Sequence, residues 1–490
     1  MNKYIGIDLG TSSVKMLLVS ADGEIVNSVT KEYPIFYPQS GWSEQNPYDW
    51  YNASIEGLKE LMAQINKDEI KGISFGGQMH GLVILDKDDN VIRPAILWND
   101  GRTQKQTDYL NEIIGKENLS RYTANIAFAG FTAPKILWVK ENEPDNFNKI
   151  CKIMLPKDYL AYRLTGSFAT DFSDASGMLL LDVEKRAWSY EMCQVCGVSE
   201  DKLPKLYESY EKIGTILPKI ANELGLSTNV SVSIGAGDNA AAAVGTGTVN
   251  NGDCNISLGT SGTVFVSQDS FSVDSKNALH SFCHSNGKYH LMGCILSAAS
   301  CNKWFVEDIL GTSNFANEEK DLDKYLGENS TYFLPYLMGE RSPHNDVCAR
   351  GAFIGMRPDT TREHMVLSVL EGVAFALRDC VEIAKSNGIN IEATKICGGG
   401  GKSKIWRKIV ANVLGIPVLR PQIEEGPAYG GAILAMVGCG EYATVSEATG
   451  KLIKTKDVTY PDDKLVEKYN ERYCAFKKLY PALKDIYKEI

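Results

Sequence analysis

Two aspartates stand beside glycine-rich turns, where a carboxylate could act on a phosphate or a hydroxyl. Asp8 ends a short apolar segment just before the turn Gly10–Ser13, and Asp238 lies in Gly235–Asn239, ahead of an alanine-rich segment. A carboxylate at a helix N-terminus is stabilised there and can act as general base on an attacking hydroxyl. A carboxylate beside bound phosphate repels it unless a cation such as Mg²⁺ intervenes. The alternative for both residues is a local role as a turn or helix cap.

The tetrapeptide Leu-Gly-Thr-Ser occurs twice, at 9–12 and at 258–261, about half the chain apart. Each copy follows an apolar run and precedes a β-rich one, which predicts strand, tight turn and strand in each half. A third glycine-rich turn, Gly398–Gly401, precedes a predicted helix. Small residues let backbone N–H groups approach phosphate oxygens, and Thr and Ser hydroxyls add donors. One such turn is weak evidence, but the three together favour phosphate binding in a cleft between two similar halves.

The segment Gly76–Gly81 places Gln78, Met79 and His80 between glycines, directly after a predicted strand. Gln and His side chains supply donors and acceptors that suit a polyol. A single histidine is more often structural than catalytic. The flanking glycines nevertheless favour an exposed loop that faces a ligand.

The rest of the chain alternates between predicted strands and helices. This pattern predicts the α/β class, and we place one domain at 1–247 and a second at 248–490. A β-meander is expected over 4–29, with further strands at 70–75, 82–85, 230–234, 395–397 and 416–419. Helices are expected at 47–66, 240–244, 361–384 and 403–414, and mostly helical structure over 120–212.

The composition is that of a globular protein with more than one domain: 490 residues, of which 44% are hydrophobic and 23% charged. A net charge of −10 disfavours nucleic acid and anionic membranes as partners. No apolar run is long enough for a membrane span, and an acidic residue comes too early for a secretory signal. The 12 scattered cysteines are therefore expected to be reduced thiols in the cytoplasm. A homodimer stays open.

Two familiar nucleotide motifs are disfavoured by their details. Gly398–Ser403 is not a Walker P-loop, because Ile396 stands where the first glycine is required. Gly235-x-Gly237-x-x-Ala240 fits a dinucleotide fingerprint, but Asp238 would place a carboxylate in the pyrophosphate cradle. An NAD-dependent oxidoreductase is therefore a remote alternative.

Several longer blocks are similar to a known family. Gly130–Asn142 resembles the first signature of the FGGY carbohydrate kinases, and Gly351–Met356 with His364–Glu371 resembles the second. Similar blocks continue to about residue 430: Trp42–Gln45, Gly76–Gly81, Ile96–Arg102, Leu155–Leu160, Ser173–Gly177 and Gly237–Ala241. The paired turns resemble those of the sugar kinase/Hsp70/actin superfold. The resemblance implies two duplicated actin-like (ribonuclease H-like) domains flanking a central cleft.

The resemblance also implies a role for each candidate residue. Asp238 would be the general base, and Asp8 would serve the metal ion of Mg·ATP. The sugar would contact Met79, His80, Asp238 and Asn239. The nucleotide would contact residues of all three turns: Thr11, Ser12, Thr260, Ser261 and Gly262 near the phosphates, and Gly399, Gly400 and Ser403 near the adenosine. The first turn carries Ser13 where many relatives have glycine.

The activity that the resemblance implies is transfer of the γ-phosphoryl group of MgATP to the 5-hydroxyl of D-xylulose. ATP and Mg²⁺ would be the cofactors and a small sugar the other ligand. Closure of the two domains after sugar binding would exclude water as a competing nucleophile. Sister kinases for glycerol, ribulose or gluconate stay open as alternatives, as does a non-catalytic sensor or an actin-like assembly protein.

Overall fold

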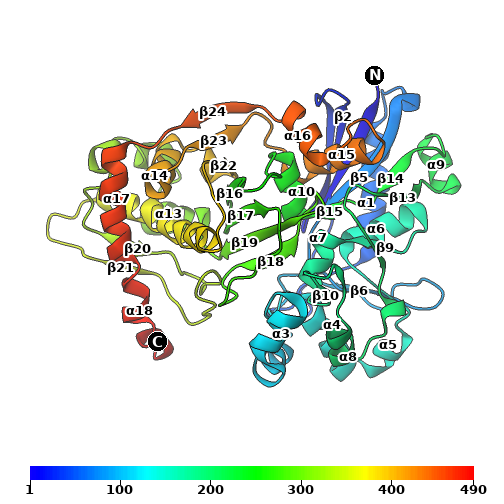
Figure 1. Cartoon of the computed structure of the whole chain (residues 1–490), viewed down its shortest axis with the longest axis horizontal. Helices are drawn as coiled ribbons and strands as arrows, with labels where there is room; N and C mark the ends of the chain where they lie inside the picture. The colour runs from blue at the N-terminus through cyan, green and yellow to red at the C-terminus, as the bar shows by residue number, and fades with distance from the viewer.

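The structure is a computed structural model that describes residues 1–490, and it forms two lobes, each built around one seven-stranded sheet (Figure 1). The N-terminal lobe lies on the right of the view and the second lobe on the left. No helix in either lobe combines the length and the apolar character that crossing a membrane requires.

The sheet of the first lobe has the order β13-β14-β5-β1-β2-β3, with the short β15 beside β5. The expected antiparallel meander consists of β1 (Lys3–Leu9), β2 (Ser13–Ser20) and β3 (Ile25–Glu32). Parallel to β1 runs β5 (Ile70–Gly77). The sheet is completed by β13 (Lys212–Thr215), β14 (Ser231–Ser233) and β15 (Ala236–Gly237).

The sheet of the second lobe has the order β18-β19-β17-β16-β22-β23-β24. Its strands are β16 (Cys254–Leu258), β17 (Gly262–Gln268), β18 (His280–Cys283), β19 (Tyr289–Ile295), β22 (Thr394–Cys397), β23 (Val418–Pro421) and β24 (Thr455–Thr459). β16, β17 and β19 are antiparallel neighbours, with β18 on the edge beside β19, and β22 runs parallel to β16, as β5 does to β1. The pairing scheme therefore repeats, which confirms the duplication predicted from the two Leu-Gly-Thr-Ser turns.

Helices cover the sheets close to where their apolar periodicity predicted them. α1 (Pro47–Leu61) packs on the first sheet, and α13 (Arg362–Ser386), α14 (Lys404–Leu414) and α17 (Asp463–Phe476) enclose the core of the second lobe. The Thr361 side chain caps α13 by accepting from the His364 N–H, and Ser403 caps α14 in the same way. The alanine-rich segment forms α10, Asp238–Gly245.

One helix late in the chain packs against the first lobe. α15 (Gly426–Gly438) lies against β1, β5 and α10, and its apolar residues share a core with Tyr4, Leu17 and Val19 (Figure 1). The backbones are so close that a Cβ on Gly430 would lie 1.8 Å from the Ala241 carbonyl oxygen. Such an approach requires glycine. The two lobes are thus joined by interleaved chain as well as by contact.

Between β5 and β14 the first lobe carries a mostly helical region. It contains α2 (Gln104–Asp108), α3 (Lys116–Thr123), α4 (Thr132–Asn142), α5 (Pro144–Lys149), α6 (Pro156–Thr165), α7 (Phe172–Ala175), α8 (Tyr190–Cys196) and α9 (Pro218–Leu224). Its apolar core includes Phe282, Cys283 and Met292 from the sheet of the second lobe. The two lobes therefore share a packed interface at β18 and β19.

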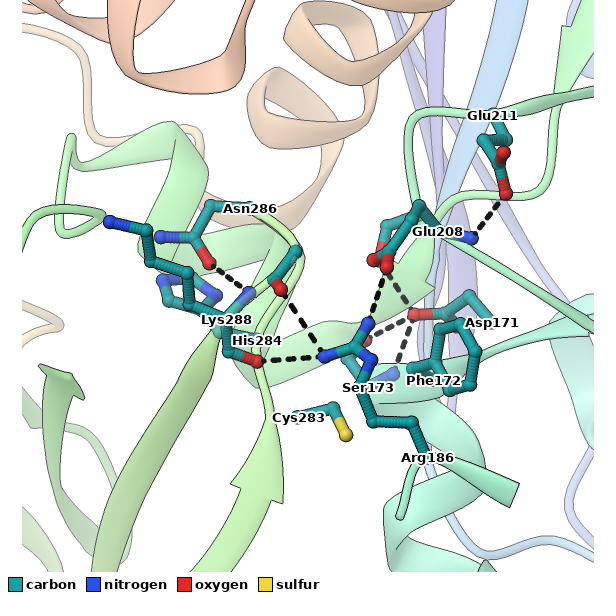
Figure 2. Close-up of polar contacts among 12 residues, drawn as sticks. Asp171, Phe172, Ser173, Arg186, Glu208, Glu211, Cys283, His284, Asn286 and Lys288 are labelled. Carbon is teal, nitrogen blue, oxygen red and sulfur yellow. Dashed lines mark hydrogen bonds and ion pairs between the residues drawn. The ribbon is translucent and has the colours of Figure 1, made fainter. Parts of the chain in front are cut away.

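Arg186 adds polar contacts to this interface (Figure 2). Its guanidinium forms an ion pair with Glu208 at 2.5 Å and lies over the Phe172 ring at 4.2 Å, both within the first lobe. The same group donates to the carbonyl oxygens of Gly287 and Lys288, each at 3.3 Å, in the turn between β18 and β19. One arginine thus connects the helical region to the second sheet.

Candidate active site

Asp8 and Asp238 come together at one end of the first sheet. Asp8 lies opposite Gly76 in the parallel pair β1–β5, and Gly237 lies opposite Gly77 in the pair β5–β15. Burial, with the nearby charge of Asp238 second, raises the pKa of Asp8 to about 7, whereas Lys15 on β2 acts in the opposite direction. Because Asp8 and Gly237 pair with consecutive residues of β5, Asp8 and Asp238 lie at the same end of the sheet.

Asp238 is the first residue of α10 and is held by its neighbour in the chain. Burial raises the pKa of Asp238 to about 6. The backbone N–H of Asn239 and its Nδ2 both donate to Asp238 Oδ1, at 2.7 and 3.0 Å, and partly offset this shift. The second carboxylate oxygen, Oδ2, makes no hydrogen bond within the chain and is free to accept a proton from a ligand.

The predicted sugar loop lies next to Asp238. Met79 packs against Gly237, where a Cβ would be 3.0 Å from the Met79 thioether. His80 Nδ1 lies 2.7 Å from the Gly177 carbonyl oxygen, so this nitrogen must carry the proton and donate it. Burial, with the charge of Lys135 second, lowers the pKa of His80 to about 3. His80 is therefore neutral, and its Nε2 is available to accept a hydrogen bond from a hydroxyl.

A lysine and a threonine of α4 hold the backbone of this loop. Lys135 Nζ donates to the carbonyl oxygens of His80 at 2.9 Å and Gly130 at 2.6 Å, and Thr132 Oγ1 donates to the His80 carbonyl oxygen at 3.1 Å. His80 has φ +69°, an uncommon conformation for a residue with a side chain. Its ring stacks on Phe131 with centroids 4.6 Å apart. The signature block 130–142 thus shapes the sugar loop, a role that the sequence did not indicate.

A buried network of one lysine and three aspartates supports β15 through a hydrogen bond to Gly237. Lys157 Nζ lies 2.7 Å from Asp158, 2.9 Å from Asp171 and 3.4 Å from Asp174, all fully buried. Asp171 accepts from Ser173 Oγ (Figure 2). The same Ser173 Oγ accepts from the Gly237 N–H at 3.2 Å. The residue before Asp238 is therefore fixed by a chain of hydrogen bonds. No sequence pattern pointed to this network, apart from the two family-like blocks, Leu155–Leu160 and Ser173–Gly177, that contain most of its residues.

The first glycine-rich turn is tied to the sugar loop. Gln78 Nε2 donates to the Gly10 carbonyl oxygen at 3.3 Å, and Gln45 Nε2 donates to the Thr11 carbonyl oxygen at 2.6 Å. Trp98 Nε1 donates to Thr11 Oγ1 at 2.9 Å, with the Trp98 ring 45% exposed. Ser12, at the tip, is exposed. Thr11 and Ser12 are thus presented at the surface close to Asp8.

The second and third turns meet around a cavity of about 700 Å³ in the second lobe. Its lining includes the predicted nucleotide residues Thr260, Gly399, Gly400 and Ser403. Ser403 Oγ donates to Glu319 Oε2 at 2.7 Å, and a Cβ on Gly400 would lie 2.8 Å from the Trp406 ring. Ser261 is exposed beside Thr260, whereas Gly262 is buried at the start of β17. The cavity has the size of small-molecule sites in proteins.

Comparisons with known proteins agree with this arrangement. The N-terminal domain model of the FGGY family of carbohydrate kinases matches residues 3–245, and the C-terminal domain model matches 254–439. The chain is 40% identical to the xylulose kinase of Escherichia coli over 98% of this chain and 99% of that protein. The crystal structure of a xyloylose kinase from Brucella ovis superposes with TM-score 0.94 at 39% identity, covering 99% of this chain and 100% of that one. A gluconate kinase structure from Lactobacillus acidophilus superposes with TM-score 0.95 at 25% identity, covering 100% and 99%.

Proposed function

The chain belongs to the FGGY family of carbohydrate kinases, and we propose that it transfers the γ-phosphoryl group of MgATP to the 5-hydroxyl of D-xylulose, giving D-xylulose 5-phosphate and ADP. The observation that carries the proposal is the placement of Asp238 between the predicted sugar loop and the first phosphate turn. The choice of D-xylulose is supported by the 40% identical xylulose kinase of Escherichia coli.

Asp238 is suited to the proton transfer that this reaction needs. With a pKa raised to about 6 it is ionised at neutral pH, yet it is more basic than an exposed aspartate. The proton of the 5-hydroxyl passes to Oδ2 as the hydroxyl oxygen bonds to the γ-phosphorus, and the bond from that phosphorus to the β,γ-bridging oxygen breaks. ADP leaves with the bridging oxygen. The two bonds from Asn239 hold Oδ1, which leaves Oδ2 without a partner in the chain.

The sugar lies along the loop Met79–His80 in this proposal. His80 Nε2 accepts from a hydroxyl group of the sugar, because Nδ1 is occupied by the Gly177 carbonyl oxygen. Met79 fills the space beside Gly237 and supplies an apolar contact to the carbon chain. The Lys135 and Thr132 bonds fix the loop before substrate arrives, which lowers the entropy cost of orienting the hydroxyl.

The nucleotide spans both lobes. The adenosine occupies the cavity lined by Gly399, Gly400 and Ser403, and its phosphates extend past Thr260 toward Thr11 and Ser12. No three His, Cys, Asp or Glu side chains gather to hold a metal by themselves. Mg²⁺ is commonly held by one or two carboxylates together with substrate phosphates, so Asp8, just before the first turn, fits it, while Asp238 Oδ2 is left to accept the proton. When bound, the ion offsets negative charge on the transferring phosphoryl group.

A coupled ADP-release assay tests the proposal, with D-xylulose, D-ribulose, glycerol and D-gluconate as acceptors. We expect D-xylulose to have the highest kcat/KM. Asp238→Ala should lower kcat by a factor on the order of 10² or more, with sugar binding largely retained. Asp201→Asn, an exposed aspartate on the first lobe, is the matched control and should leave turnover unchanged. Near-normal turnover of Asp238→Ala would refute the role of Asp238 as general base. A higher kcat/KM for another acceptor would refute D-xylulose as the substrate.

A further inference from the structure

Arg341 belongs to a loop of the second lobe that is pinned in place. Glu340 Oε1 accepts from the backbone N–H groups of Leu296 at 2.8 Å and of Arg341 itself at 2.7 Å. Ser342 is bonded through its backbone N–H and its Oγ to both backbone groups of Cys294, at the end of β19. The backbone of Arg341 is therefore fixed on a strand of the second sheet, and only the side chain is free to vary.

The guanidinium of Arg341 faces the first lobe and has no carboxylate partner. It lies 4.8 Å from the centroid of the Phe128 ring and makes neither an ion pair nor a hydrogen bond within the chain. Burial raises the pKa of the adjacent Glu340 to about 8, so this residue supplies little negative charge at neutral pH. The other arginines of the cleft region differ, since Arg102 is paired with Asp100 and Arg186 with Glu208. The half-buried guanidinium therefore has N–H donors that are available to bind a ligand.

A chain of aromatic contacts connects Arg341 to the sugar loop. Phe128 packs edge-on against Phe131 at 5.5 Å and against His280 of β18 at 5.2 Å, and Phe131 stacks on His80. The charge of Arg341 contributes to the lowered pKa of both His80 and His280. The contacts through Phe128 and Phe131 therefore connect Arg341 to the His80 side of the candidate site.

The two lobes enclose a cavity of about 340 Å³ at this point. Phe128 and Gly130 line it from the first lobe, and Leu296, Glu340 and Arg341 line it from the second. Gly130 is also the residue whose carbonyl oxygen binds Lys135, so the cavity wall is continuous with the support of the sugar loop. A side chain of the second lobe thus lines a cavity whose opposite wall includes Gly130, a residue that takes part in the support of the sugar loop.

We propose that Arg341 binds the carbonyl end of the sugar and selects ketoses over the corresponding alditols. The inference rests on the proposed function, because it takes the reacting hydroxyl to lie at Asp238. A guanidinium has donors only, so it favours an oxygen that only accepts, such as the C2 carbonyl oxygen of D-xylulose. In xylitol, the C2-reduced counterpart, a hydroxyl stands there: its oxygen can still accept, but its proton finds no acceptor on the guanidinium, so the match is poorer. The cation–π contact with Phe128 restricts the Arg341 guanidinium before the sugar binds.

The test compares the KM for D-xylulose with the inhibition constant of xylitol as a competitor, in the wild-type protein and in Arg341→Gln. We expect the KM for D-xylulose to rise roughly 10- to 100-fold, which corresponds to the loss of one charge-assisted hydrogen bond. The inhibition constant of xylitol and the KM for ATP should change little. Arg341→Lys retains the charge and should recover part of the loss. Arg357→Gln, at an exposed arginine of the same lobe, is the control and should change neither constant.

The outcomes separate this inference from the proposed function. Equal weakening of D-xylulose and xylitol, an unchanged KM for D-xylulose, or a fall in kcat alone would overturn the assignment of Arg341, while turnover of D-xylulose by the wild-type protein would still support the kinase. Absence of ADP release with D-xylulose in the wild-type protein would instead overturn the substrate itself.

Discussion

Replacing Lys135 by Met tests how the first lobe prepares the sugar loop. The Lys135 side chain is fully buried on α4, without an ion pair, and its two bonds to the carbonyl oxygens of His80 and Gly130 hold the loop. The change removes both bonds and leaves two buried carbonyl oxygens with fewer partners. We expect the KM for D-xylulose to rise about tenfold or more, since the loss of one such bond corresponds to about 1 kcal/mol or more. The KM for ATP should be unaffected.

Lys135 should also make the free energy of unfolding depend on pH. Burial lowers the pKa of Lys135 from 10.5 to about 7. Below pH 7 the folded and unfolded states both bind this proton, so the full cost of burying the charge is present. Between pH 7 and 10.5 the unfolded state binds more protons than the folded state, so stability rises with pH, by up to about 1.4 kcal/mol per unit. Summed over that range, the contribution is on the order of 5 kcal/mol.

Urea unfolding at several pH values between 7.5 and 9.5 measures this contribution as the free energy of unfolding of the wild type minus that of Lys135→Met. As pH rises, the wild type should gain stability relative to the variant, because methionine has no proton to lose. Lys140→Met, at the exposed end of the same helix, is the control and should show no such slope. A stability difference that does not change with pH would show that burial does not lower the pKa of Lys135. An unchanged KM for D-xylulose would show that Lys135 does not position the loop.

Two further predictions concern the metal and the interface of the lobes. Because the pKa of Asp8 is raised to about 7, the apparent affinity for Mg²⁺ in the ADP-release assay should increase as pH rises from 6 to 8, and Asp8→Asn should abolish this dependence. Arg186→Met should destabilise the protein by about 2 kcal/mol in urea unfolding, because it leaves Glu208 partly buried without its partner. Adding Glu208→Gln should recover part of that loss, and a purely additive double variant would contradict the coupling.

The parts of the fold that local sequence determines could be predicted. The two Leu-Gly-Thr-Ser turns connect adjacent antiparallel strands, β1 with β2 and β16 with β17, so each is specified by a few consecutive residues. α13 was predicted at 361–384 and spans Arg362–Ser386, because its apolar periodicity is long and its cap lies directly before it. Short-range patterns of this kind can be interpreted without knowing which other elements pack against them.

Long-range packing could not be predicted in the same way. α15, Gly426–Gly438, is apolar on nearly every side, which shows that it is buried but not where. Its partners, β1 and α10, lie far away in the sequence, and the contact depends on glycines that match across the interface. The role of Lys135 has a weak signal, since the residue stands among the apolar side chains of α4, where a lysine is rarely buried without a function.

The site residues differ in the same respect. Asp8, Asp238 and His80 stand directly beside turns, which is why the sequence alone marks them as candidates. The residues that aim them come from distant segments: Gln45 and Trp98 hold the first turn, and Lys157 lies behind β15. Each of these has an ordinary sequence context, and only the tertiary structure gives it a partner.

In the binding mode that we propose, the distribution of these residues over the two lobes would link sugar binding to closure of the lobes. The first lobe supplies Asp238 and His80, whereas Arg341 and His280 come from the second and contact the first lobe through Phe128. A ligand held by groups of both lobes binds the closed arrangement more tightly than an open one, so it shifts the population toward closure. Because ATP is expected to contact turns of both lobes as well, sugar and nucleotide favour the same arrangement. Their binding should therefore be cooperative, and weakening the contact of Arg341 should weaken that cooperativity along with the selection for ketoses.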